Sequence, residues 1–292
     1  MTSFAAMAVA ALGLMAVLPA AAQKTPEGEL ILRSFANAPY PHRSRENGYT
    51  VNGKAFDAAT HYSDSTVGIF IPAGLKPGEA TDFVVHFHGH MNHVSQVFEE
   101  YNLRKEFVQS GMNAILLVPQ GPKDATDSGD GHLELDAGGF EALLREVAAY
   151  LHGAGKLTTE KIGRVTLTAH SGGYNVTSAI LQRGGLADNI RDVVLFDASY
   201  GNLEGFAEWA KRGHGRRLIS LFTEHLASAN VILMSMLQGR GVKYKVTLDG
   251  EWKDADLKAR SVLFIHTLDL AHNDTVSKKD YFARFLAAGS TR

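Results

Sequence analysis

The ten residues Val165–Tyr174, VTLTAHSGGY, decide how the rest of the sequence is interpreted. An apolar, β-branched run typical of a buried strand leads directly into the small residues around Ser171, and a helical pattern follows. A serine between a strand and a helix, flanked by small residues, is typical of a sharp turn that exposes its hydroxyl. Ala169 stands where glycine is commoner, and Gly172 and Gly173 supply the room beyond. We therefore predict a nucleophilic Ser171, although Ser-x-Gly alone is a common turn sequence.

Outward from this stretch, apolar strands alternate with helical patterns in one unbroken domain. The predicted strands are Glu29–Ser34, Thr66–Ile71, Phe83–His88, Ala114–Val118, Arg164–Thr168, Asp192–Phe196, Leu218–Phe222, Tyr244–Leu248 and Val262–Ile265. Helices are expected over Val94–Val108, Phe140–Leu151, from about Gly172, over Ala227–Leu237 and over Tyr281–Leu286. Continuous apolar strands between helices predict the α/β class, with a mostly parallel central sheet and helices on both faces. Residues 37–63 are expected to form a long surface excursion.

A histidine-rich stretch, HFHGH at residues 86–90, ends one predicted strand. A His-Gly pair at this place commonly begins a loop that donates a backbone N–H to an oxyanion hole. We expect the amides of His90 and Gly172 to be the two donors, because backbone donors are fixed before charge develops. The residues expected to line the substrate site are His88, Gly89 and Tyr200.

The same stretch permits a metal interpretation. His86, His88 and His90 would share one face if the strand continued, and His93 follows closely, so a zinc site is geometrically possible. The stretch lacks an obvious distal carboxylate partner in sequence. We therefore predict no metal, and a zinc hydrolase built on the His86–His93 cluster remains an alternative.

His272 lies between the last predicted strand and the closing helix. The chain has 13 histidines, so this position, rather than the residue type, makes His272 the predicted general base. Its orienting acid has three candidates. Asp197 directly follows an apolar strand, at the end where ligands gather in parallel sheets, and is favoured. Glu224 follows the next strand, and Asp269 precedes His272 closely.

With these residues in place, the sequence resembles the α/β-hydrolase superfamily, and within it secreted bacterial esterase- or lipase-like members. The resemblance covers most of the chain by element order, and its specific matches are His88-Gly89, Ala169–Gly173, Asp197 and His272. It implies hydrolysis of an ester or related acyl bond through a Ser-His-Asp triad and an acyl-enzyme, without a cofactor. The fold hosts many chemistries, so the resemblance leaves the substrate open.

Composition excludes several other classes. The formal net charge is −2, which gives no basic excess for nucleic acid or an anionic membrane surface. With no cysteine, the chain has no disulfide, Cys nucleophile, Cys metal ligand or lipoprotein anchor. We expect a small-molecule or acyl substrate as its partner. A peptidase or amidase on the same fold and a non-catalytic binding protein remain alternatives, which a fluorophosphonate probe and substrate panels distinguish.

The first residues have the pattern of an export signal. Met1–Ala22 carries no charged side chain, and the apolar run Phe4–Leu18 is shorter than the roughly 20 residues of a membrane span. It ends in three alanines at residues 20–22, which suits signal peptidase, although the missing Lys or Arg is atypical. We predict a cleaved signal over residues 1–22 and a mature domain over residues 23–292. The mature protein is then periplasmic or secreted and has no stable membrane span; an uncleaved anchor is the alternative.

Overall fold

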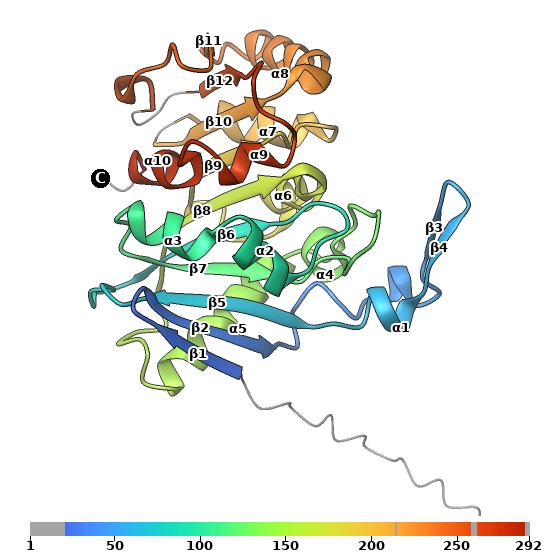
Figure 1. Ribbon diagram of the computed structural model, residues 1–292, viewed down its shortest axis with the longest axis vertical. Helices are drawn as coiled ribbons and strands as arrows, with labels where there is room; N and C mark the ends of the chain where they lie inside the picture. The colour runs from blue at the N-terminus through green and yellow to red at the C-terminus, as the bar shows by residue number, and fades with distance from the viewer. Residues whose placement is uncertain (1–20, 214, 258–261, 290–292) are drawn as a thin grey trace, which may run out of the picture.

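The computed structural model describes residues 21–213, 215–257 and 262–289, and its central feature is one long twisted sheet (Figure 1). Ten strands of the described chain lie in the order β1-β2-β5-β7-β6-β8-β9-β10-β12-β11. They are β1 Ala21–Thr25, β2 Gly28–Ser34, β5 Thr66–Pro72, β6 Thr81–Phe87, β7 Ala114–Pro119, β8 Ile162–His170, β9 Ile190–Phe196, β10 Arg217–Phe222, β11 Lys245–Leu248 and β12 Val262–His266. Seven neighbouring strands among those described run parallel: β7, β6, β8, β9, β10, β12 and β11. At the other end of the sheet, β1, β2 and β5 pair antiparallel, and β5 also pairs antiparallel with β7.

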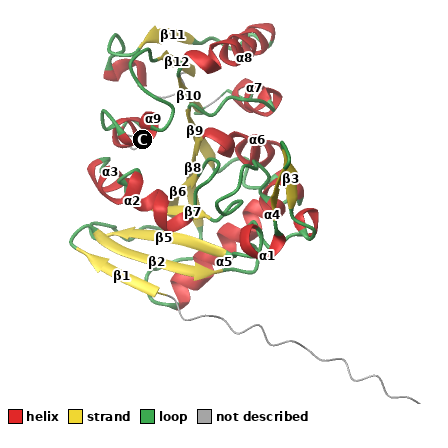
Figure 2. Cartoon of the chain, turned by 45° about the vertical axis from the view of Figure 1, so that its right-hand side comes forward, coloured by secondary structure: helices red, strands yellow, loops and turns green. Residues whose placement is uncertain are grey.

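Helices cover both faces of this sheet (Figure 2). One face carries α5 Gly139–Gly153, α6 Tyr174–Arg183, α7 Leu203–Lys211 and α8 Ala227–Gly239; the other carries α2 Val94–Glu100, α3 Leu103–Gln109 and α10 Tyr281–Ala287. Side chains alternate along each strand, so Val193 and Leu195 of β9 join one core cluster while Val194 and Phe196 join the other. Burial on both faces explains why these strands are continuously apolar. The predicted fold class is confirmed.

The structure corrects two details of the predicted helices. The expected helix Val94–Val108 is broken into α2 and α3, because Asn102 takes the left-handed conformation at φ 49° between them. The helix α7 was not predicted, although Leu203, Phe206 and Ala210 on its buried face have helical spacing. Smaller helices missed by the sequence are α4 Gly131–Leu135 and α9 Asp274–Ser277.

The surface excursion has its own small elements. It holds the short helix η1 Arg43–Arg45, the hairpin β3 Tyr49–Val51 and β4 Lys54–Phe56, and α1 Ala58–His61. In Figure 1 the hairpin projects from the body, but its base is anchored. Tyr40, Phe56 and Tyr62 form a buried cluster with Ala125, and the Tyr40 hydroxyl donates to the Gly129 carbonyl at 2.9 Å. The excursion therefore packs on the loop at residues 121–131.

The predicted signal falls almost entirely outside the described residues, which begin at Ala21. Ala21 and Ala22 open the edge strand β1, where they pair with Leu32 and Ile31 of β2. Among the helices of the described residues, none is long and apolar enough to cross a membrane.

Candidate active site

Ser171 lies on a strained turn between β8 and α6. Its φ is +52°, a left-handed value that costs a non-glycine residue free energy, and one 3-10 turn, η2 Ser171–Gly173, leads into the helix. The packing around this turn leaves no room for larger residues. A Cβ on Gly89 would come within 2.6 Å of the Ser171 Cβ, and a Cβ on Gly173 would come within 2.6 Å of the Phe87 carbonyl oxygen. The turn therefore has the sharp geometry that its small residues predict.

Asp197 and His272 meet at the same edge of the sheet. Asp197 directly follows β9, also with a positive φ of 48°, and its side chain is fully buried. The His272 Nδ1–H donates to Asp197 Oδ2 at 2.7 Å. Thr223, which follows β10, adds its backbone N–H at 2.8 Å to Oδ1 and its hydroxyl at 2.9 Å to Oδ2. Three donors from two other segments thus hold this carboxylate.

These donors decide the charge of the carboxyl group. Burial raises the pKa of Asp197, but the hydrogen bonds from His272 and Thr223 outweigh burial and leave that pKa below its ordinary value. An ionised carboxylate only accepts hydrogen bonds, so His272 must carry its proton on Nδ1. The other ring nitrogen, Nε2, is then the basic one.

The two competing acids lie elsewhere. Glu224 pairs with His266 Nε2 at 3.0 Å and is largely exposed. Asp269 is held by Lys279 at 2.7 Å and by the Thr267 hydroxyl at 3.0 Å. Of the three candidates, the structure brings Asp197 into contact with His272.

A second histidine, which the sequence did not single out, connects Tyr200 to the same carboxylate. The Tyr200 hydroxyl and His225 Nε2 are 2.8 Å apart, and His225 Nδ1 lies 2.6 Å from the Thr223 hydroxyl. Because that hydroxyl donates to Asp197, its oxygen accepts from His225 Nδ1–H, and His225 Nε2 accepts from Tyr200. Tyr200 also stands edge-on to His272, with ring centroids 6.2 Å apart. No local sequence pattern marks His225, which lies three residues past β10.

His170, the residue before Ser171, contacts both the ring and the backbone carbonyl of His272. The two ring centroids are 4.7 Å apart, and His170 Nε2 lies 3.3 Å from the His272 carbonyl oxygen. Burial, with the neighbouring His272, lowers the pKa of His170 to about 3, so the ring is neutral. Its Nε2–H therefore donates to the carbonyl, and its Nδ1 accepts from the Tyr101 hydroxyl at 3.3 Å.

Both ring nitrogens of His88 hydrogen-bond to backbone groups of the protein. Its Nδ1–H donates to the Gly89 carbonyl at 2.8 Å, and its Nε2 accepts from the Gly121 amide at 3.2 Å. The side chain is buried and both ring nitrogens are engaged, so the expected contact of this imidazole with substrate does not fit the geometry. The bond to the Gly89 carbonyl instead fixes the peptide plane that carries the His90 N–H.

The four clustered histidines point to four different partners. His86 Nδ1 is 2.9 Å from the Thr168 hydroxyl, His90 Nε2 is 2.8 Å from the Ser128 hydroxyl, and His93 Nδ1 is 3.0 Å from Asp124. Because β6 ends at Phe87, these side chains do not continue along one strand face. Among the described residues, the His86–His93 cluster does not form a metal-binding group.

The two expected oxyanion donors lie beside Ser171. A Cβ on Gly89 would be 3.1 Å from Ser171 Oγ, and a Cβ on Gly172 would be 2.8 Å from the ring of His90. The loop that carries His90 therefore packs directly against the serine turn. Within the described part of the chain, the amides of His90 and Gly172 donate to no other group.

The chain is similar to known proteins in structure and not in sequence. No protein-family model matches the sequence, and no curated protein matches it. A feruloyl esterase module from Clostridium thermocellum, complexed with sinapinate, has a TM-score of 0.56 at 10% identity, over 95% of this chain and 96% of that one. An S-formylglutathione hydrolase from Agrobacterium tumefaciens has a TM-score of 0.51 at 12% identity, over 93% of this chain and 100% of that one.

A third similar structure is FphF of Staphylococcus aureus, described as a fluorophosphonate-binding serine hydrolase, with a TM-score of 0.51 at 11% identity over 80% of this chain and 95% of that one. At such identities the likeness concerns the fold, and it agrees with the parallel sheet, the two helical layers and the serine turn after β8. The chain therefore has the α/β-hydrolase fold.

Proposed function

We propose that this protein is a serine hydrolase that cleaves an ester or related acyl bond, with Ser171, His272 and Asp197 acting together. The observation that carries the proposal is the 2.7 Å hydrogen bond from His272 to the buried Asp197, at the same sheet edge as the strained Ser171. A serine hydroxyl becomes a strong nucleophile when an oriented imidazole accepts its proton, and a buried carboxylate fixes that imidazole.

In the first half of the proposed reaction, Ser171 Oγ attacks the carbonyl carbon while His272 Nε2 takes the hydroxyl proton. Asp197 remains ionised and stabilises the resulting imidazolium through Nδ1–H, in keeping with its lowered pKa. The tetrahedral intermediate collapses when His272 returns that proton to the leaving alcohol. The acyl group is then bonded to Ser171.

In the second half, water replaces the alcohol. His272 Nε2 accepts a proton from the water as its oxygen attacks the acyl carbon, and the proton then returns to Ser171 Oγ as the acid leaves. In both halves the carbonyl oxygen carries negative charge. The amides of His90 and Gly172 are the proposed donors to it, supported by their free N–H groups and by the His88 bond that fixes the first of them.

An ester is the favoured bond among acyl substrates. The feruloyl esterase and the S-formylglutathione hydrolase share this fold, and the described residues of the site carry the whole proposed chemistry without a cofactor. The test is kcat/KM on p-nitrophenyl esters of different acyl length, compared with the matching anilides. Higher kcat/KM on anilides than on esters would favour an amidase instead.

Replacement of Ser171 tests the nucleophile. Ser171→Ala should lower kcat on the best ester by several orders of magnitude, because the residues act as a unit. Ser63→Ala is the matched control, since its hydroxyl bonds the Ala59 carbonyl in the excursion. A folded Ser171→Ala protein that keeps most of its activity would refute the assignment.

We also propose that the protein is exported, on the evidence of its charge-free apolar start and the three alanines at residues 20–22. Cleavage after Ala22 leaves Gln23–Thr25 of β1 to pair with β2. N-terminal sequencing of protein from the native host should begin near Gln23, and an intact Met1 would count against export.

A further inference from the structure

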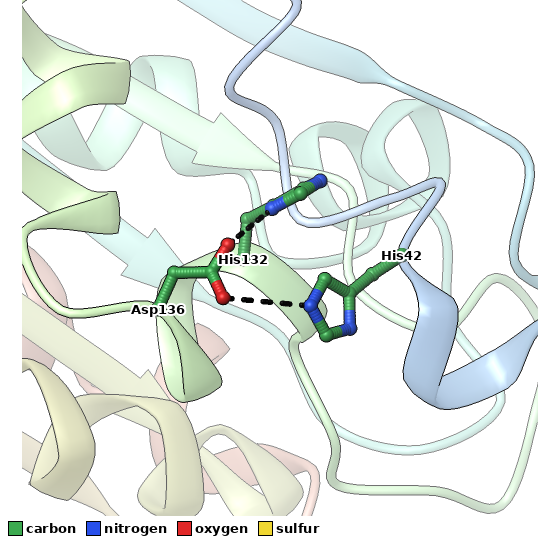
Figure 3. A group of neighbouring side chains, drawn as sticks. All are labelled: His42, His132 and Asp136. Atoms are coloured by element: carbon green, nitrogen blue, oxygen red, sulfur yellow. Dashed lines mark hydrogen bonds and ion pairs between the residues drawn. The ribbon is translucent and has the colours of Figure 1, made fainter.

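His42, His132 and Asp136 form a cluster of possible metal ligands away from Ser171 (Figure 3). Asp136 contacts both rings: its Oδ2 is 2.6 Å from His132 Nδ1, and its Oδ1 is 3.5 Å from His42 Nε2. One donor atom from each residue lies within 4.8 Å of the other two. His42 belongs to the excursion just before η1, whereas His132 lies on α4 and Asp136 is the residue that directly follows this helix.

The donor set suits a transition-metal ion. Two imidazole nitrogens and one carboxylate oxygen match Zn²⁺, which takes such ligands tetrahedrally at about 2.0–2.2 Å. Ligand atoms at those bond lengths lie roughly 3.3–3.5 Å apart, which the 3.5 Å between His42 Nε2 and Asp136 Oδ1 already matches. Mg²⁺ and Ca²⁺ prefer all-oxygen sites, so the two imidazoles disfavour them.

The outer nitrogen of each ring already has a hydrogen-bond partner, and in histidines that bind metals this partner orients the ring. His132 Nε2 lies 3.0 Å from the Pro41 carbonyl oxygen, to which it donates, so Nδ1 is directed toward Asp136. His42 Nδ1 lies 2.8 Å from the Ser44 hydroxyl and, without metal, accepts from the Ser44 amide at 3.2 Å. In the metal-bound form, the His42 proton moves from Nε2 to Nδ1, which donates to that hydroxyl and gives up the hydrogen bond from the Ser44 amide. The His42 side chain is only 5% exposed, which holds the ring in place.

We propose that His42, His132 and Asp136 bind one divalent transition-metal ion, with Zn²⁺ the best match. The ion replaces the proton that His132 Nδ1 shares with Asp136, and this proton goes to solvent. The fourth position is left to water. The site joins the excursion to α4, directly after the loop in which Ser128 contacts His90. The ion therefore fastens the excursion to the segment that borders the serine turn.

Zinc binding by the chelator-treated full-length protein tests this proposal. Isothermal titration with ZnCl₂ alone should give one ion per chain at this site, with at least tenfold weaker binding in His42→Gln and in His132→Gln. His152→Gln is the matched control, because His152 also pairs with a carboxylate, Glu160 at 3.1 Å, but has no third ligand among the described residues. Zinc should raise the melting temperature of the wild type and this control, and not of the two site variants.

Two further variants keep the result unambiguous. Asp197, His225 and His272 are a second group that could take zinc, so each titration is repeated in a His225→Gln background. If either histidine variant fails to fold, Asp136→Asn replaces it, because the Asp136 side chain is 43% exposed and tolerant of change. The proposal is overturned if the folded wild type binds no zinc, or if the site variants bind it as tightly as the wild type and His152→Gln.

Discussion

At the scale of single residues, the charge of Asp197 sets the state of His272. Its buried carboxylate accepts Nδ1–H at 2.7 Å, so an amide in its place would present an N–H to the ring and favour the wrong tautomer. Asp197→Asn should therefore lower kcat on an ester by about 10⁴-fold with little change in fold.

Glu224→Gln is the natural comparison for that variant. Glu224 pairs with His266 at the surface, so its loss should leave kcat within a factor of about two. Steady-state kinetics on the same ester measure both variants. A collapse of activity in Glu224→Gln, with Asp197→Asn near wild type, would move the acid to the end of β10.

His170 is expected to act as a positioning residue. Its Nε2–H holds the His272 carbonyl at 3.3 Å and its ring lies against the His272 ring. His170→Phe keeps the aromatic contact and removes the hydrogen bond, so kcat should fall about tenfold while KM stays within about twofold.

His86→Phe is the matched control for this change. His86 is also fully buried, but its Nδ1 bonds Thr168 and the ring contacts Phe282, away from His272. It should cost stability without changing kcat of the folded protein. Equal losses of kcat in both variants would mean that His170 supports the core alone.

The sequence points to the candidate serine and base more clearly than to the residues that position them. Ser171 carries a local signal, since a strained turn demands small neighbours in adjacent sequence positions. His225 and His170 carry none, because their roles depend on contacts with Tyr200 and with the His272 carbonyl from distant parts of the chain. Asp197, which directly follows β9, was favoured over Glu224, which lies two residues past β10, but only the contact with His272 distinguishes the two carboxylates.

At the scale of elements, α3 and α10 meet over a buried carboxyl group. Glu106 of α3 accepts the Ala283 amide in the first turn of α10 at 3.1 Å, yet burial and the nearby Asp280 raise the pKa of Glu106 to about 7. A raised pKa means that the folded protein holds this proton more tightly than the unfolded chain does. The stabilising effect is complete below pH 4.5 and is lost as the pH rises through about 7.

Glu106→Gln should remove this dependence, because an amide cannot ionise and still offers an oxygen to Ala283. Urea unfolding at pH 5 and pH 8 measures it: the wild type should lose more stability between these values than Glu106→Gln. The same pH dependence in both proteins would show that Glu106 does not titrate in this range.

The bounds of the helices show where the spacing of apolar residues and the packing of the folded chain disagree. The run Val94–Val108 has one helical stripe, but the chain turns at Asn102 so that α3 can reach α10. Helix α7 has an apolar stripe at helical spacing but was not predicted from the sequence. Strands were easier to predict, since burial on both faces makes them apolar throughout.

At the scale of the whole molecule, the topology brings the site together. Ser171, Asp197 and Thr223 follow β8, β9 and β10, which are adjacent parallel strands, so their carboxyl ends meet at one edge. His272 reaches the same edge on the segment between β12 and α9. Strand order is a property of long-range pairing that the sequence pattern does not contain, which is why the class of fold was predictable and the contacts of His225 and His170 were not.

The proposed function depends on the activation of Ser171 by His272 and Asp197. Fluorophosphonate labelling of the folded protein, with the modified peptide mapped by mass spectrometry, tests it most directly, because the probe reacts with an activated serine. One adduct is expected, on Ser171; it should be lost in Ser171→Ala and form far more slowly in Asp197→Asn. No labelling of the folded wild type, or an adduct on another serine, would contradict it.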